Sequence, residues 1–453
     1  MRRFFRWLGR GSAALLLFLF LAYWLVPPLT ETFFDTAAVR QKLHTVMLPS
    51  DQPKQIRLPK EQKRIFRAMN LRTYLGTAAW TLLDLPALSF HYLTLEPRYK
   101  TISRQAVGLF VDPAKNRTTD ILQALKELNV SSVAQRIYLD DAFLASPDYT
   151  RHLQLAKALH TRGYNLTLVL AQTFESFDTN LTATMDKVVK DFAPYVDFYQ
   201  IAEAVNRSKW GVPDKDDYLA FVDAAFDAIH RLDPTAKTLG PSVIDFEWFY
   251  TLYFDHLAGD RFDIANTLLY VDRVRQPENE QHGFDTDAKI RLFKAIRPDT
   301  PLWITEVNWP LKDQGRYKPT SNKEAVSETQ YRDYMLRYLI IALGSGYVDR
   351  VYWWQLFAKG YGLIDHLTLR RRSAFDALAA LQRLLPGSRP LGHRHEDGLY
   401  DYRFTREGRR FRLLWTKDGK SRPLPAGLHC RTLEGTAPVL RLGPTPIFCQ
   451  ENP

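Results

Sequence analysis

The sequence predicts an α/β protein built on a (β/α)8 TIM barrel, followed by a small antiparallel β domain. From about residue 105, apolar strand-like runs alternate with helical segments, the pattern of repeated βα units. The alternation completes eight strand–helix pairs by residue 386. Beyond that point, short alternating runs are separated by Gly, Pro and charged turns. An open doubly wound sheet is the alternative, but no Gly-rich phosphate turn opens a helix after any strand.

The predicted strands are largely continuous apolar runs, which suits strands that are covered on both faces. They are Ala106–Val111, Val133–Leu139, Leu166–Ala171, Phe198–Ile201, Thr238–Val243, Ile264–Tyr270, the run within Pro301–Leu311 and Arg350–Leu356. The predicted helices are Thr118–Leu128, Tyr149–Arg162, Leu181–Phe192, Tyr218–Leu232, Phe246–Leu257, Ala288–Ile296, Glu328–Leu343 and Ala374–Leu385. Together they assign residues 105–386 to the barrel and residues 387–453 to the β domain.

The N-terminal region predicts a membrane anchor. Four arginines lie within residues 1–10, and the uncharged stretch 11–30 has about the 20 residues needed to span a bilayer. Acidic Glu31 and Asp35 follow it, so we expect residues 1–10 in the cytoplasm and the body of the protein outside the inner membrane, in the periplasm. A cleaved signal peptide is the alternative, but no small-x-small site follows promptly. The sequence therefore predicts a single-pass inner-membrane protein.

Residues 31–104 form a predicted connector with membrane-proximal helices. Its second apolar stretch, Tyr74–Leu95, contains Asp84, Pro86 and His91, which argue against a second membrane span. We expect a helix that lies along the membrane surface or packs on the barrel.

The composition limits the partners. Across 453 residues, Lys+Arg minus Asp+Glu is 61 − 50 = +11, so nucleic acid, anionic lipid and acidic polysaccharide are all compatible by charge. No zinc-finger or helix-turn-helix pattern is present, so nucleic acid is not expected as a partner. No Cys-x-x-Cys pair or Cys/His cluster has metal spacing, so neither a metal site nor a cofactor is predicted.

The two cysteines, Cys430 and Cys449, lie close together in the β domain. In an extracytoplasmic compartment they would form a disulfide. Two unpaired thiols in the core are the alternative.

Polar and aromatic residues follow several predicted strands at their carboxyl ends, where barrels carry catalytic groups. The apolar run in PLWITEVNWPL ends on Glu306, and the fourth strand is followed by Glu203. Two carboxyls across a sugar can act as a nucleophile and an acid/base. The other candidates, predicted to bind substrate, are Arg136, Asn206, Tyr270, Asn308, Trp309, Trp353, Trp354 and Gln355. Because strand side chains alternate, only one of the adjacent tryptophans should face the barrel axis.

The order of elements and the motif LWITEVNWP resemble the clan of retaining (β/α)8 glycoside hydrolases, which includes cellulase-like and β-xylosidase-like enzymes. The resemblance extends from Ala106 to the C-terminus. It implies that Glu306 is the nucleophile, that Glu203 is the acid/base and that Arg136 keeps the nucleophile ionised. It also implies a glycan substrate, here an envelope or extracellular polysaccharide cleaved by a membrane-anchored hydrolase.

The chain departs from that clan at the fourth strand. The usual ending is Ile/Val-x-Asn-Glu-Pro-Asn; aligned without gaps from Ile201, the acid position falls on Ala204 and Glu203 takes the place of the Asn. Successive strand residues face opposite sides, so either the strand end is bulged and Glu203 reaches the substrate, or the acid is lost. A catalytically inactive glycan-binding module is therefore the second hypothesis, with a transglycosylase between the two.

Overall fold

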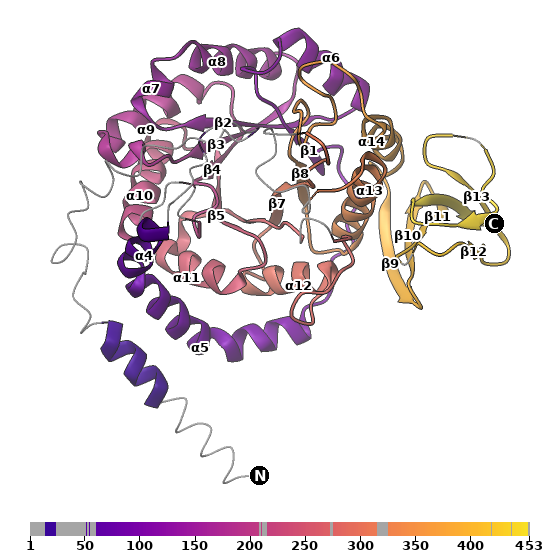
Figure 1. The fold of residues 1–453 in the computed structure, drawn as a ribbon, viewed down its shortest axis with the longest axis horizontal. Helices are drawn as coiled ribbons and strands as arrows, with labels where there is room; N and C mark the ends of the chain where they lie inside the picture. Colours follow the sequence, from indigo (N-terminus) through magenta and orange to yellow (C-terminus); the bar gives the residue numbers. More distant parts are fainter. Residues whose placement is uncertain are drawn as a thin grey trace.

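The structure is a computed structural model that describes residues 14–23, 51, 54, 60–207, 210, 215–271, 275–314, 325–417, 419–435 and 437–451. Figure 1 shows the barrel at the centre, with helices around it and the C-terminal sheet attached to one side.

Eight parallel strands close into a barrel in sequence order, which confirms the predicted TIM-barrel fold. Parallel pairing of β1 with β8, in which Val107 lies opposite Val351, completes the closure. The strands are β1 (Val107–Phe110), β2 (Ser132–Tyr138), β3 (Asn165–Ala171), β4 (Phe198–Ile201), β5 (Lys237–Ile244), β6 (Ile264–Leu268), β7 (Leu302–Val307) and β8 (Arg350–Trp353).

Most of the helices around the barrel bury an apolar stripe against the strands; in α6, for example, Ile121, Leu125 and Leu128 are buried. Side-chain caps define several of their starts, including a capping box of Ser327 and Gln330 at α13. The helices are α6 (Thr118–Leu128), α7 (Asp141–Leu144), α8 (Pro147–His160), α9 (Leu181–Phe192), α10 (Lys215–Leu232), α11 (Trp248–Ala258), α12 (Thr286–Ile296), α13 (Glu328–Gly344) and α14 (Ser373–Leu384). Two 3-10 turns are η1 (Glu175–Asp178) and η3 (Gly259–Arg261).

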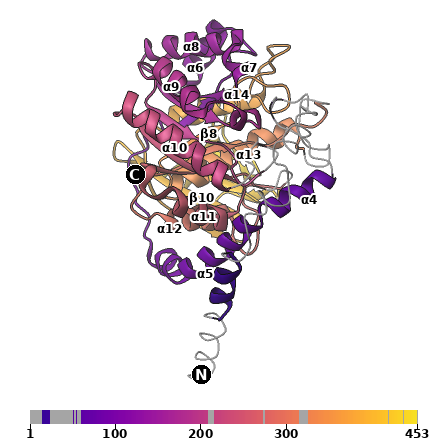
Figure 2. The same cartoon turned by 90° about the vertical axis from the view of Figure 1, so that its left-hand side faces the viewer.

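The connector contributes two helices, α4 (Lys60–Met69) and α5 (Leu71–Thr94). Helix α5 forms an additional layer outside α11 and α12 (Figures 1 and 2). Gly76 allows close contact, because a Cβ atom there would lie 2.6 Å from the side chain of Tyr253 in α11. This apolar stretch therefore packs on the barrel, which is one of the two placements predicted for it.

Part of the predicted anchor is described as a helix, residues 14–23; the rest of the 11–30 stretch lies outside the described residues. Within the described ranges, no helix combines the length and the apolar character required to cross a bilayer.

The C-terminal region forms an antiparallel five-stranded sheet in the order β13-β15-β11-β10-β9, together with a two-stranded β12-β14 sheet. The sequence predicts three short runs here, Leu399–Phe404, Arg410–Trp415 and Val439–Leu442, which correspond to β10, β11 and, in part, β14. Sequence reasoning missed β9, β12, β13 and β15, because they are short or mostly polar and lack clear alternation. The strands are β9 (Arg389–Glu396), β10 (Leu399–Arg406), β11 (Arg409–Thr416), β12 (Arg422–Pro423), β13 (Leu428–Thr432), β14 (Arg441–Leu442) and β15 (Ile447–Glu451).

The five-stranded sheet packs on α13. Gly344 permits this, because a Cβ atom at that position would lie 2.6 Å from the ring of Tyr402 on β10. The indole of Trp415 also donates a 2.6 Å hydrogen bond to Glu278 of the barrel. The C-terminal domain is therefore fixed to the barrel wall by packing and by buried polar contacts.

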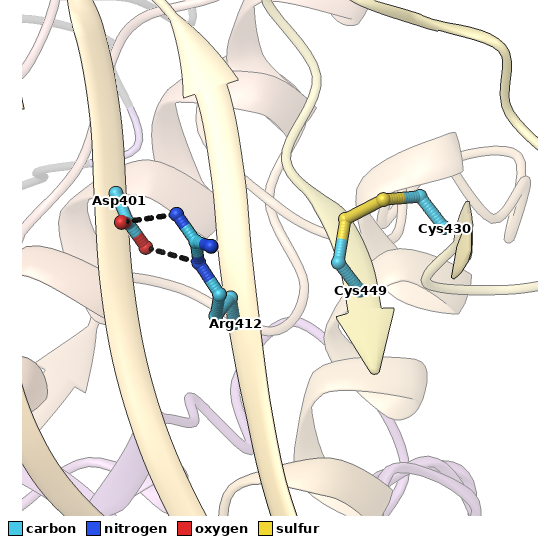
Figure 3. The surroundings of a disulfide bond; sticks show 4 residues. All are labelled: Asp401, Arg412, Cys430 and Cys449. Atoms are coloured by element: carbon cyan, nitrogen blue, oxygen red, sulfur yellow. Dashed lines mark hydrogen bonds and ion pairs between the residues drawn. A yellow bond between two sulfur atoms is a disulfide. The ribbon is translucent and has the colours of Figure 1, made fainter. Parts of the chain in front are cut away.

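Cys430 on β13 and Cys449 on β15 lie directly opposite each other and form a disulfide. Figure 3 shows this bond beside the Asp401–Arg412 ion pair, which joins β10 to β11. The disulfide therefore ties the edge strand β13 to its neighbour β15.

We predict that the double variant Cys430→Ser, Cys449→Ser lowers the free energy of unfolding by about 2–4 kcal/mol, because the bridge restricts the unfolded chain. Denaturant titration of both proteins measures this difference. Reductant should destabilise the native sequence and leave the double variant unchanged. Quantitative alkylation of both thiols in native, unreduced protein would contradict the prediction.

Candidate active site

Two buried glutamates share one arginine at the carboxyl end of the barrel. Glu306 lies near the end of β7, Glu203 follows β4, and Arg136 lies near the end of β2. Nη2 of Arg136 donates to Oε2 of Glu306 at 2.8 Å and also to Oε1 of Glu203. Two oxygens bonded to one nitrogen lie at most about 6 Å apart, since each such bond is about 3 Å long. The three residues come from separate strands and meet only in the closed barrel.

The backbone at the end of β4 explains how Glu203 enters the site. The flanking residues Ala202 and Ala204 have φ angles of 64° and 47°, a left-handed conformation that is uncommon outside glycine. This interrupts the strand alternation just after Ile201. The strand end is therefore irregular, and the carboxyl of Glu203 reaches Arg136.

Gln172, directly after β3, holds this irregular segment. Its Oε1 accepts a 3.0 Å hydrogen bond from the backbone N–H of Glu203, and its Nε2 donates to the Glu203 carbonyl at 2.5 Å. The side chain replaces the strand pairing that the left-handed residues interrupt. Sequence reasoning missed Gln172; the available signal was a polar residue immediately after an apolar strand.

Ala204 occupies the position where the clan carries its acid. It is fully buried in an apolar cluster with Trp210, Ile244, Leu268 and Tyr270. An ionised side chain there would lie among apolar groups, without the hydrogen bond that Arg136 donates to Glu203.

The electrostatics give the two glutamates different environments. Burial raises the pKa of Glu203 well above its usual range; Arg136 opposes this shift and Glu306 adds to it. Burial alone would lower the pKa of Arg136, but the two carboxylates and Tyr138 raise it above its usual value, so the guanidinium stays charged. Glu306 accepts at both oxygens, since Tyr270 donates to its Oε1 at 2.5 Å. One carboxyl is thus suited to carry a proton and the other to accept hydrogen bonds.

A cavity of about 170 Å³ lies beside Arg136, and neither Glu203 nor Glu306 is among its lining residues. Arg136, Tyr138, Trp354 and Gln355 contribute to its wall, and Arg136 lies 5.9 Å from the ring centroid of Trp354. Burial raises the pKa of Tyr138 to about 12, so its hydroxyl remains neutral.

Two residues of the N-terminal connector also line this cavity. Asp51 accepts a 2.7 Å hydrogen bond from the backbone N–H of Gly360, and Lys54 forms a 2.9 Å ion pair with Asp140. The sequence offered no signal for this contribution, because it depends on how the chain passes over the barrel rim.

The remaining predicted site residues lie in the layer that supports the rim. The amide of Asn206 is bonded at 3.0 Å to both the N–H and the carbonyl of Ile244, so it holds the end of β5. Asn308 donates to the carbonyl of Tyr361 at 2.8 Å. Trp309 and Trp353 stack on each other and pack against tyrosines of α13.

The side chains of the adjacent Trp353 and Trp354 point to opposite faces of the barrel wall, as strand alternation requires. Trp353 packs outward and donates to the hydroxyl of Tyr331 in α13, whereas Trp354 belongs to the apolar cluster inside the barrel. Trp354 is thus the one near Arg136. Asn206, Asn308, Trp309 and Trp353, predicted as substrate contacts, instead have their polar groups and rings engaged by the protein itself.

No group of three His, Cys, Asp or Glu side chains in the described parts of the chain has an arrangement that could hold a metal ion.

Solved glycoside hydrolases share this fold. The chain is similar to a family 39 glycoside hydrolase from Bacteroides cellulosilyticus WH2, with a TM-score of 0.59 and 13% identity over 78% of this chain and 82% of that one. It is also similar to a GH30 endoxylanase from Clostridium papyrosolvens C71, with a TM-score of 0.53 and 12% identity over 79% and 97% of the two chains. The chain is similar as well to a GH39 β-xylosidase from Caulobacter crescentus, with a TM-score of 0.51 and 14% identity over 79% of this chain and 98% of that one. The sequence matches no protein-family model and no curated protein. At these identities the likeness establishes the fold.

We predict that Arg136→Met destabilises the protein in a pH-dependent manner. Removing one partner of a buried ion pair typically costs about 3–5 kcal/mol. Without the guanidinium, the pKa of Glu203 should rise further in the folded state, because burial and Glu306 raise it and Arg136 opposes them. The variant should therefore approach native stability at about pH 4 and lose stability as the pH rises through the raised pKa of Glu203.

Denaturant midpoints measured across this pH range test the prediction. Arg136→Lys retains the positive charge and should show a smaller pH dependence. Arg151→Met, which removes an exposed arginine paired only with Asp148, should change stability by at most about 0.5 kcal/mol. A loss in Arg136→Met that is equal at all pH values would contradict the electrostatic explanation.

Proposed function

We propose that this protein is a retaining glycoside hydrolase in which Glu306 is the nucleophile and Glu203 the acid/base. The observation that carries the proposal is the pair of buried carboxyls held on one guanidinium, with Glu203 favouring its protonated form. Retaining enzymes hold their two carboxyl groups about 5–5.5 Å apart, whereas inverting enzymes separate them by about 6.5–9.5 Å. Oxygens that share one nitrogen are compatible with the shorter spacing.

In the proposed first step, Glu306 attacks the anomeric carbon while Glu203 transfers its proton to the glycosidic oxygen. The bond from the anomeric carbon to that oxygen breaks, and a glycosyl ester forms on Glu306. Glu203, now a carboxylate, then removes a proton from water, which displaces Glu306 from the sugar. Tyr270 and Arg136 hold Glu306 at the start and accommodate the charge it regains at the end.

The proposed substrate is an envelope or extracellular polysaccharide, and the proposed location is the periplasmic side of the inner membrane. The N-terminal arginines and the apolar stretch that follows them support an anchor. Trp354 lines the cavity next to Arg136 and offers an aromatic ring there, as sugar sites often do.

The second candidate is a catalytically inactive glycan-binding module on the same fold, and Ala204 at the usual acid position is the observation that favours it. A transglycosylase uses the same first step, with a sugar hydroxyl replacing water in the second.

We predict that Glu306→Ala abolishes turnover, because no group remains to form the glycosyl ester. Glu203→Ala should impair substrates with poor leaving groups by about 10²–10⁴-fold and affect activated aryl glycosides far less, because those leave without protonation. Azide should partly rescue Glu203→Ala, since a small anion can attack the glycosyl-enzyme without a general base. Rates on the two substrate classes measure these effects.

Glu247→Gln is the matched control, because Glu247 is a rim carboxylate that contacts Asn206 and Arg207 and lies outside the pair. It should retain turnover. Equal losses on both substrate classes in Glu203→Ala would remove Glu203 from the acid role. An inactive native protein whose glycan binding is unchanged in Glu306→Ala would favour the binding module.

We predict that the full chain resists alkaline carbonate extraction from membranes, because its apolar stretch 11–30 is long enough to span the bilayer. A chain that begins at Lys60 retains α4 and α5 and should be extracted. Membrane fractionation followed by immunodetection measures both. A shortened, soluble product of the full-length gene would instead identify the apolar stretch as a cleaved signal.

A further inference from the structure

The outer face of α5 is apolar and uncovered. Leu83, Leu85, Phe90 and Leu93 are exposed, with 64% of Phe90 and 74% of Leu93 accessible. Elsewhere in the described residues, large exposed apolar side chains occur in the helix at residues 14–23 and otherwise only at Leu367, Leu369, Leu391 and Leu440. A concentration of exposed apolar side chains on one helix marks an interaction surface.

Two of the charged or titratable groups of α5, Asp84 and His91, lie toward the barrel, and Arg72 lies at the N-terminal end of the helix. Apart from tyrosines, the helix has three ionisable residues, Arg72, Asp84 and His91. His91 contacts the carbonyl of Ala295 in α12, and Asp84 lies near His256 of α11, where burial lowers the histidine pKa and Asp84 opposes that shift. The guanidinium of Arg72 lies 5.5 Å from the ring centroid of Tyr23. Most of the outer face is therefore free of charge.

The surroundings of α5 indicate what covers this face. The preceding helix, α4, exposes Lys60, Lys63, Arg64 and Arg67. The contact between Arg72 and Tyr23 brings the apolar helix at residues 14–23 to the beginning of α5, and Figure 2 shows that helix beyond α5, away from the barrel. Basic residues beside an exposed apolar face, continuous with a second exposed apolar helix, are complementary to a bilayer with anionic headgroups.

We propose that α5 lies flat in the interfacial region of a lipid bilayer, with its outer face toward the acyl chains and the basic residues of α4 at anionic headgroups. The helix cannot span the membrane in this state, because its inner face packs on α11 and α12 through Gly76 and Leu88. The barrel would then be held against the membrane by its α11–α12 side, in one orientation, rather than moving freely on a tether. This proposal is independent of the glycosidase assignment.

The test places single cysteines in the full-length chain at exposed sites, as Phe90→Cys or Leu93→Cys on α5. Leu440→Cys is the matched control, since Leu440 is 81% exposed on the C-terminal domain, and Leu17→Cys reports on the N-terminal apolar helix. Cys430 and Cys449 are joined in a disulfide, so only the introduced thiol takes an environment-sensitive fluorophore. Each protein is mixed with vesicles of phosphatidylethanolamine and phosphatidylglycerol. Nitroxide on the upper acyl chain and aqueous iodide are the two quenchers.

Labels at positions 90 and 93 should shift to the blue and be quenched several-fold more strongly by the nitroxide than the label at position 440. Iodide should show the reverse order. If only the label at position 17 enters the lipid, the chain is attached by its N-terminal stretch alone and the proposal is overturned. Protection of positions 90 and 93 from iodide without vesicles would assign the face to a second copy of the chain and would also overturn it.

Discussion

The site depends on one guanidinium that keeps two carboxyls buried together. Each carboxylate would lose several kcal/mol of hydration on burial, and the two repel each other. Arg136 offsets one negative charge, and the raised pKa of Glu203 allows a proton to neutralise the second. The carboxyl ends of β2, β4 and β7 must therefore lie at the same height along the barrel axis, so that Arg136 reaches both glutamates. An acid beside an acceptor-only carboxylate is a consequence of that charge balance.

The backbone on either side of Glu203 is strained. Ala202 and Ala204 adopt left-handed conformations, each of which costs roughly 1–2 kcal/mol for an L-residue. Gln172 compensates by bonding both backbone groups of Glu203, and Ala204 packs into an apolar cluster. Strain retained by surrounding contacts is common at functional sites. Here it directs a carboxyl into the barrel from a position where regular alternation would turn it away.

The C-terminal sheet and helix α5 pack on different helices of the barrel. The C-terminal sheet packs on α13, the same helix whose Tyr331 contacts Trp353 and Asn308, so the sheet supports the layer that lies under the rim. Helix α5 covers α11 and α12 and leaves an apolar face outward. Of the connector residues that the structure describes, Asp51 and Lys54 line the cavity beside Arg136. The outer face of α5 and the cavity are therefore separate surfaces.

The periodicity of the sequence determined the barrel, because buried parallel strands and amphipathic helices leave strong local patterns. It also placed Glu306 and Arg136 near the carboxyl ends of their strands, where the structure joins them by a hydrogen bond. Tertiary structure decided the rest. Whether Glu203 faces inward depends on two φ angles, and Gln172, Asp51 and Lys54 depend on which segments meet in space. The polar strands β9, β13 and β15 are stabilised by pairing with their neighbours. Such contacts leave no local signal, because they join residues that are distant in the chain.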